Sequence, residues 1–375
     1  MMRPMPQRRI ARARRHGQIA SRELQMLTEA CAANFRSGRL PDPRTFNDVD
    51  WAQAAALARR HRVQALVWAG LAGGRGEIPE AVAEGLRGDA SAIAARNLAA
   101  AAELARLKSL WSAKGPRVLW VKGLTLGALA YQQPMLKMSV DIDILVAFDD
   151  LEAAARLLRD AGYDAAEPRG LTSRIPLGRW HRAWKESVWR HRDKDIWLDL
   201  HSQLADRDDL IPTIGMESPV HEVEVTPGLT LPTLADEELF AYLCVHGASS
   251  AWFRLKWVTD LAAFLDGRPR AEIERLYQRS QQLGAWRAAA QALLLADRLY
   301  GTLEGSHLRR QLMADRANRR MLRIALRMLL ADREPSHSRF GTALIHYNQL
   351  RLAPGIRPGI RLMVRQFRKA RLERR

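Results

Sequence analysis

The sequence contains little cysteine and no long hydrophobic run. Cys31 and Cys244 are its only cysteines among 375 residues, and neither belongs to a CxxC pair or a Cys/His cluster. This pattern argues against a disulfide framework or a structural zinc site, so we expect a reducing, cytoplasmic location. No apolar run reaches the roughly 18 to 20 residues that a membrane span requires. We therefore expect no transmembrane segment.

Acidic residues are almost absent from both ends of the chain. Residues 1–22 contain seven arginines and no acid, and residues 351–375 contain nine Lys or Arg against the single acid Glu373. The two ends supply 15 of the 18 net positive charges. We interpret them as a basic N-terminal arm and a basic C-terminal tail. Each is either a solvated segment or a surface for an anionic partner such as nucleic acid or an acidic peptide.

Helical patterns dominate on both sides of a shorter middle segment. The sequence predicts helices at 21–35, 54–71, 80–110, 235–246, 253–265, 271–283, 285–300 and 308–331. The middle segment predicts strands at 117–121, 139–146, 183–191 and 195–200, with helices at 124–131 and 149–161. We therefore expect a helical N-terminal region (23–113), an α/β domain (114–232) and a helical C-terminal domain (233–350).

Two acids interrupt the apolar strand predicted at 139–146. Side chains alternate along a strand, so Asp141 and Asp143 are expected to project from the same face, about 6 to 7 Å apart. Burying unpaired charges costs several kcal/mol. The pair therefore indicates either an edge strand with a solvated face or a site for divalent cations.

Two further features favour the cation site. Lys122-Gly123 ends one strand and begins a helix, and glycine with the free N–H groups of a helix N-terminus favours phosphate. Asp199 interrupts a second apolar strand, where it faces opposite to Leu198 and Leu200. Three carboxylates suit Mg²⁺ or Mn²⁺. The set predicts two-metal nucleotidyl transfer, with Asp199 on the side of the attacking hydroxyl.

These motifs resemble a known family. The chain is similar to a bacterial group of uncharacterised nucleotidyltransferases in the polymerase-β-like nucleotidyltransferase superfamily. The similarity lies in four segments: Val121-Lys122-Gly123, Asp141 to Val146, Asp199-Leu200-His201 and Arg254 to Trp257. The resemblance implies an α+β fold, with a small mixed-sheet nucleotidyltransferase domain flanked by N- and C-terminal helical regions. It also implies transfer of a nucleoside monophosphate from an NTP to an unidentified hydroxyl, amine or phosphate acceptor, which releases pyrophosphate.

The resemblance also implies roles for individual residues. Asp141, Asp143 and Asp199 would be the catalytic, metal-binding acids. The nucleotide would be bound by five residues that surround them, namely Lys122, Gly123, Lys137, Ser139 and Lys256. The sequence departs from the family pattern at two positions: Leu124 stands where the superfamily usually has a serine, and Asp199 where the group usually has Glu.

Several other residues admit two readings. His201 shares the strand face of Asp199 and would either orient that acid or serve the structure alone. Arg254 and Lys256 diverge by about 200° on a helix, so at most one faces a cleft, and we expect Lys256. Four tryptophans either belong to the core or stack on the base of the nucleotide: Trp180, Trp184, Trp189 and Trp197. Two other functions remain open: a catalytically inactive module that binds nucleic acid or an acidic peptide, and a toxin-type enzyme acting on RNA.

Overall fold

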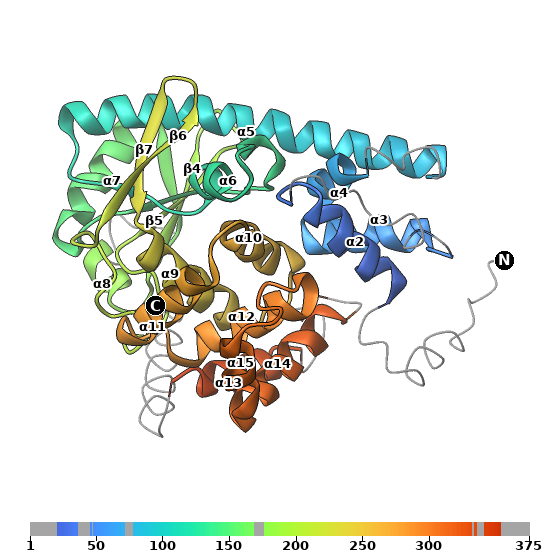
Figure 1. The fold of residues 1–375 in the computed structure, drawn as a ribbon. Helices are drawn as coiled ribbons and strands as arrows, with labels where there is room; N and C mark the ends of the chain where they lie inside the picture. The colour runs from blue at the N-terminus through green and yellow to red at the C-terminus, as the bar shows by residue number, and fades with distance from the viewer. Residues whose placement is uncertain are drawn as a thin grey trace.

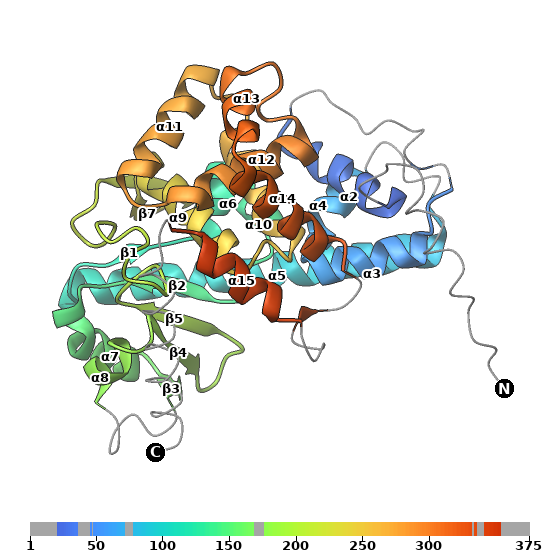
Figure 2. The same cartoon turned by 90° about the horizontal axis from the view of Figure 1, so that it is seen from below.

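The computed structural model describes residues 21–36, 46, 48–71, 78–168, 176–331, 334–335 and 341–353. Helices from both halves of the chain surround a five-stranded sheet and a separate two-stranded hairpin (Figures 1 and 2). The prediction of a mixed sheet between helical regions is confirmed. Most of the predicted basic arm and basic tail lies outside the described residues.

The five-stranded sheet has the order β1-β2-β5-β4-β3, in which β2 and β5 are parallel and the other neighbours are antiparallel. Its strands are β1 (Leu119–Trp120), β2 (Ile142–Leu145), β3 (Tyr163–Glu167), β4 (Glu186–His191) and β5 (Trp197–His201). The pattern of the sequence did not indicate β3. The β2/β5 pairing matters most for function, because it sets Asp143 opposite Asp199.

A long helix, α5 (Glu80–Lys114), covers one face of this sheet (Figure 1). Leu104, Leu107 and Trp111 lie at helical spacing and pack in one cluster with Ile142 and Ile144 of β2. Helix α7 (Leu151–Asp160) contributes to the same cluster, and the short helix α8 (Leu177–His181) lies beside it. The other face of β2 carries the acids.

The hairpin of β6 (Val220–Thr226) and β7 (Leu229–Leu234) was not predicted. Gly228 closes its turn with a φ of 79°, a left-handed conformation that glycine adopts without strain. Val225, Leu229 and Leu231 pack on the cluster of α5 and the sheet. The hairpin thereby extends that core beyond β1.

The remaining helices form a second large cluster that joins the two halves of the chain. Helix α2 contacts α10 and α12, and α6 contacts α10. These helices are α2 (Arg22–Ala32), α3 (Trp51–His61), α4 (Gln64–Gly70), α6 (Gly123–Tyr131), α9 (Asp236–Ser249), α10 (Leu255–Leu265), α11 (Arg270–Gln282), α12 (Trp286–Tyr300), α13 (His307–Ala314), α14 (Arg316–Leu329) and α15 (Ala343–Arg351).

Two predicted helices are each interrupted. Helix 54–71 is α3 and α4, because Arg62 takes a left-handed conformation with a φ of 58°. Helix 308–331 is α13 and α14, because Asp315 lies in an extended conformation and its carboxylate caps Ala317. Asp50 caps α3, since its Oδ1 accepts from Gln53 N at 3.0 Å.

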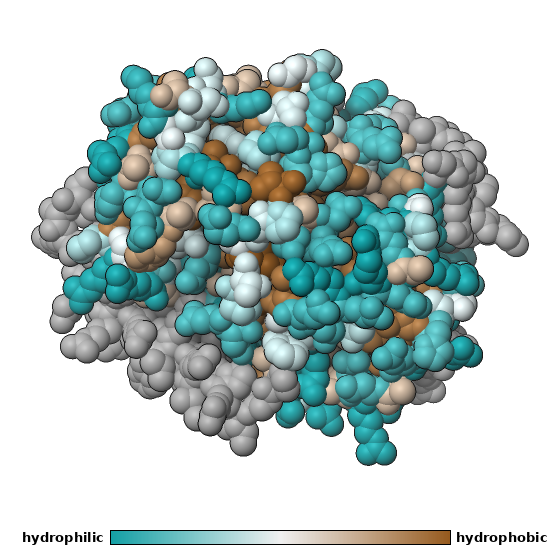
Figure 3. All heavy atoms as spheres, turned by 60° about the vertical axis from the view of Figure 1, so that its left-hand side comes forward, coloured by the Kyte–Doolittle hydropathy of each residue, from teal (hydrophilic) through white to brown (hydrophobic). Residues whose placement is uncertain are grey.

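Most of the surface in Figure 3 is hydrophilic, and hydrophobic residues appear there in interrupted areas. None of the described helices combines the length and the apolar character needed to cross a bilayer.

Candidate active site

Three carboxylates meet on one face of the sheet. Asp143 of β2 lies opposite Asp199 of β5 in the parallel ladder, so the two side chains are neighbours. Asp141 precedes β2, which begins at Ile142 and not at residue 139 as predicted. The strand starts later because the Ser139 hydroxyl donates to the Asp141 carbonyl at 3.0 Å, which bends the chain there. Asp141 therefore stands at the edge of the sheet.

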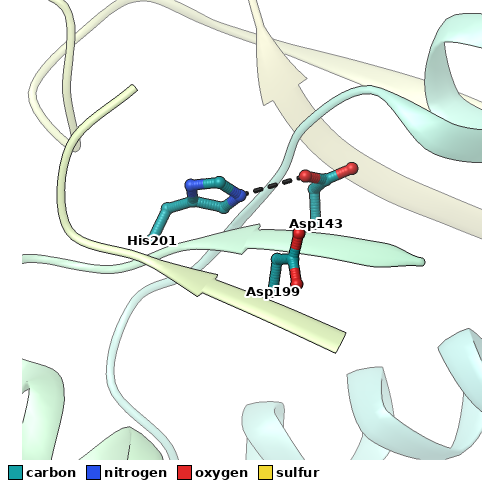
Figure 4. Close-up of side chains that lie close together, drawn as sticks. All are labelled: Asp143, Asp199 and His201. Atoms are coloured by element: carbon teal, nitrogen blue, oxygen red, sulfur yellow. Dashed lines mark hydrogen bonds and ion pairs between the residues drawn. The ribbon is translucent and has the colours of Figure 1, made fainter. Parts of the chain in front are cut away.

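Asp143 is the most tightly held of the three acids. Its Oδ1 lies 2.7 Å from Lys122 Nζ and 3.0 Å from His201 Nε2. Figure 4 shows His201 and Asp199 on one strand, with the Asp199 carboxylate pointing toward Asp143. One ligand atom from each of these three side chains lies within 4.8 Å of the others. His201 thus orients Asp143 rather than Asp199.

The surroundings shift the pKa values of the three acids in different directions. Burial raises the pKa of Asp143, but the Lys122 ammonium and the hydrogen bond from His201 bring it below its ordinary value. Burial and the Asp143 charge raise the pKa of Asp141. Burial, followed by the charges of Asp143 and Asp141, raises the pKa of Asp199 to about 8. A bound divalent cation would relieve this repulsion, and the donor set suits Mg²⁺ or Mn²⁺.

The turn from β1 to α6 lies beside these acids. Lys122 and Gly123 both have positive φ values, 61° and 51°. A Cβ at Gly123 would lie 3.4 Å from Ser139 Oγ, so the Ser139 hydroxyl sits against the turn. Leu124 points into the hydrophobic core at 3% exposure. Ser139 therefore presents a hydroxyl at this turn.

A cationic pocket of about 160 Å³ opens on the other side of the turn, against α9 and α10. Lys122, Lys137 and Lys256 line it together with Asp141 and Asp143. Burial and the neighbouring Lys137 ammonium lower the pKa of Lys256 to about 8. A bound anion would oppose both causes, because it would stabilise the charged form of the lysine. The five residues predicted to bind the nucleotide all line this pocket.

Other side chains fix the lysines in place. Lys137 Nζ lies 3.6 Å from Asp260 Oδ2, and Tyr131 donates to Asp260 Oδ1 at 2.8 Å. Asn97 of α5 donates to the Lys137 carbonyl at 2.8 Å, which fixes the segment that leads to Asp141. As expected, Arg254 points elsewhere than Lys256 and pairs with Glu334 at 3.3 Å.

Sequence reasoning missed several residues around the site. Arg62 lines the lysine pocket, and Glu186 Oε2 of β4 lies 3.2 Å from His201 Nδ1, although outside hydrogen-bond geometry. Lys122 Nζ also lies 5.8 Å from the centre of the Tyr242 ring. No local pattern marks these residues, because each reaches the site from a distant element. Trp189 is fully buried in the core, while Trp197 is half-buried.

The fold and the site define a mixed α/β protein with an acidic cluster able to bind a metal ion, next to a cationic pocket. A family model described as "Uncharacterised nucleotidyltransferase" matches residues 47–301, more than half of the chain. The chain belongs to this nucleotidyltransferase family. Among curated proteins, none matches it.

Proposed function

We propose that the protein is a metal-dependent enzyme that transfers a nucleoside monophosphate from an NTP to a hydroxyl, amine or phosphate acceptor, with release of pyrophosphate. Membership of the nucleotidyltransferase family supports the reaction type. The observation that carries the proposal is the pairing of Asp143 with Asp199 on adjacent parallel strands, with Asp141 beside them. The mixed sheet and the order of these motifs support a polymerase-β-like nucleotidyltransferase domain.

The lysine pocket is the proposed site for the phosphates. Lys137 is buried and Lys256 is half-buried, and both line the pocket together with the turn at Gly123. Backbone N–H groups at the start of α6 add donors for phosphate oxygens. Because the pocket is cationic and small, it suits the pyrophosphate end of an NTP.

Asp141, Asp143 and Asp199 would hold the metal ions. A divalent cation at these acids would neutralise charge on the phosphate oxygens and lower the pKa of the attacking group. Lys122 and His201 hold Asp143 in place from two directions. Asp199 is the acid farther from Lys137 and Lys256 in this arrangement, since it does not line the described walls of their pocket. We therefore place the acceptor on the Asp199 side.

The test is release of pyrophosphate from each of the four NTPs with Mg²⁺. We expect Asp143→Asn and Asp199→Asn to lower the rate about 100-fold or more, because each removes a charge that holds the metal. Asp193→Asn is the matched control, since Asp193 is an exposed acid in the turn between β4 and β5. The proposal fails if both site variants fold and release pyrophosphate at the rate of the control.

A further inference from the structure

A second, larger pocket adjoins the acidic cluster. It has a volume of about 600 Å³ and lies between α5 and the first residues of β2 and β5. In the part of the chain that the structure describes, it shares only Ser139 and Asp141 with the lysine pocket. Its other walls come from α5 and β5, whereas those of the lysine pocket come from α9 and α10. Asp141 therefore stands between two pockets of different chemistry.

We propose that this second pocket, the α5 pocket, binds the acceptor, and that the acceptor carries its reacting hydroxyl or amine on a flat apolar ring. The inference rests on the proposed function, with the pyrophosphate end of the NTP in the lysine pocket. In-line displacement requires the attacking atom to approach phosphorus from the side opposite the leaving pyrophosphate. The α5 pocket reaches Asp141 beside Trp197, at the start of the strand that carries Asp199, whereas the lysine pocket reaches Asp141 from α9 and α10. In the step, the acceptor oxygen or nitrogen bonds to the α-phosphorus, pyrophosphate leaves with the bonding electron pair, and the acceptor proton passes to a carboxylate.

The walls of the pocket favour a ring. Ala99 and Ala102 of α5 present small side chains, and the other walls include Trp197 of β5 and Ile196, which precedes that strand. Ile142 pairs with Leu198 in the parallel ladder. Asp141 comes directly before Ile142 and the half-buried Trp197 directly before Leu198, so Trp197 and Asp141 are neighbours in the pocket wall. The Arg190 guanidinium lies over the Trp197 ring, 5.4 Å from its centre, and a ligand ring would pack against the part of the indole that lines the pocket. A pocket of this volume is in the range that small-molecule sites occupy.

The charges of the α5 pocket are mostly compensated from within. Buried Glu103 accepts hydrogen bonds from Arg106, from Lys194 at 2.6 Å and from Tyr163 at 2.9 Å. With Arg96, Asp141 and Asp195 included, the described walls carry three cations and three acids, so their formal charges balance. Of the three acids of the cluster, only Asp141 is among the described walls of this pocket, so the polar end of the ligand belongs there. An uncharged ring with a polar end fits this distribution.

The pocket can be filled without touching the acids. Ala99 and Ala102 are exposed on α5, so Ala99→Phe and Ala102→Phe would occupy the pocket and leave the helix intact. Ala105→Phe is the matched control, because Ala105 is an equally exposed alanine outside the described walls of the pocket. Binding of tyramine, with ethanolamine as the ring-free comparison, is measured by saturation-transfer NMR on the full chain.

We expect tyramine to bind the wild type and the Ala105 variant, and to bind both pocket variants about tenfold more weakly, equivalent to about 1.4 kcal/mol. Ethanolamine should bind much more weakly than tyramine. Equal binding of tyramine to all four proteins, no binding to the wild type, or equal binding of the two amines would overturn the inference. Pyrophosphate binding, measured by calorimetry, separates the two proposals: its absence in the wild type counts against the proposed function, whereas the tyramine result decides the α5 pocket.

Discussion

Lys122 acts on the acidic cluster through both its backbone and its side chain. Its φ of 61° and ψ of −144° lie in a region that residues other than glycine rarely adopt, at a cost of about 1 to 3 kcal/mol. Its ammonium pairs with Asp143 at 2.7 Å. The Val121 N–H donates to the Asp143 carbonyl at 3.0 Å, so β1 and β2 fix the same position. The strained turn therefore brings the cation, the acid and the start of α6 together.

The charge state of Lys256 should control the affinity for pyrophosphate. Its pKa of about 8 means that the free ammonium is lost as pH rises through 8, so affinity for pyrophosphate should fall above that pH. Pyrophosphate itself becomes more negative over this range, so a fall must come from the protein. Lys256→Arg should move the fall to higher pH, because a guanidinium stays charged. Calorimetric titrations between pH 7 and 9.5 would measure both.

Two further variants test the assignment. Lys256→Met should weaken pyrophosphate binding by roughly tenfold at pH 7, as expected for loss of one charged hydrogen bond. Lys114→Met, at an exposed lysine near the end of α5, should leave it unchanged. A flat pH profile in the wild type, or equal affinities for the two variants, would remove Lys256 from the phosphate site.

At the scale of elements, two glycines are expected to respond in opposite ways. Gly123 has a φ of 51°, and an added Cβ would make only ordinary contacts, the nearest at 3.4 Å, so Gly123→Ala should destabilise by about 1 kcal/mol through backbone strain. Gly88 lies in the middle of α5 with open space around it, so Gly88→Ala should stabilise by about 0.5 to 1 kcal/mol. Urea midpoints would show shifts of opposite sign; a Gly123 variant as stable as the wild type would contradict the strained turn.

Local patterns predicted the elements that carry the acids. Alternation of apolar and acidic residues around Asp143 and Asp199 was sufficient, because a period of two is a property of the strand alone. The β6 and β7 hairpin was missed although Pro227-Gly228 marks its turn, since Pro232 within β7 argues against a strand. The break at Arg62 has no sequence signal at all, because arginine seldom adopts a left-handed conformation.

Contacts between distant elements explain what the sequence did not predict at the site. Glu186 approaches His201 because β4 and β5 pair in register, and Arg62 reaches the lysine pocket because α3 ends there. The β2/β5 pairing, too, has no local signature. A sequence pattern therefore identifies the acids, but packing determines which residues hold them.

On the scale of the whole molecule, the acidic cluster lies where the two large hydrophobic clusters meet. Ile142 and Ile144 belong to the cluster of α5 and the sheet, whereas Leu145 and Val121 belong to the cluster of N- and C-terminal helices. The phosphate and acceptor pockets follow the same division, one against α9 and α10 and the other against α5. A change in the packing of either cluster is therefore expected to alter one pocket more than the other.

Both clusters contain a histidine that must stay neutral. His181 Nδ1 lies 2.8 Å from Ser202 Oγ, and His61 Nδ1 accepts from Leu255 N at 3.1 Å. Burial lowers the pKa of each histidine from 6.5 to about 3. Between these values the unfolded chain binds more protons than the folded protein, so stability falls as pH decreases below 6.5. Each histidine contributes a slope of at most about 1.4 kcal/mol per pH unit.

Between pH 6.5 and 5 the carboxylates of Glu103 and Glu186 do not contribute, because their pKa values are lowered from 4.5 to about 2. The raised pKa values of Asp141 and Asp199 give slopes of opposite sign in this window, so the effect of one histidine is measured as the difference between variants.

We expect a net fall of the wild-type urea midpoint across this window, because burial lowers the pKa values of three histidines, His61, His181 and His246. His181→Gln removes one titrating group, so it should lower the midpoint at pH 7.5 but make its pH dependence shallower. His307→Gln, at an exposed histidine that begins α13, should keep the wild-type slope. If His181→Gln retained the full slope as well, the proton uptake on unfolding would have to come from groups other than this buried imidazole.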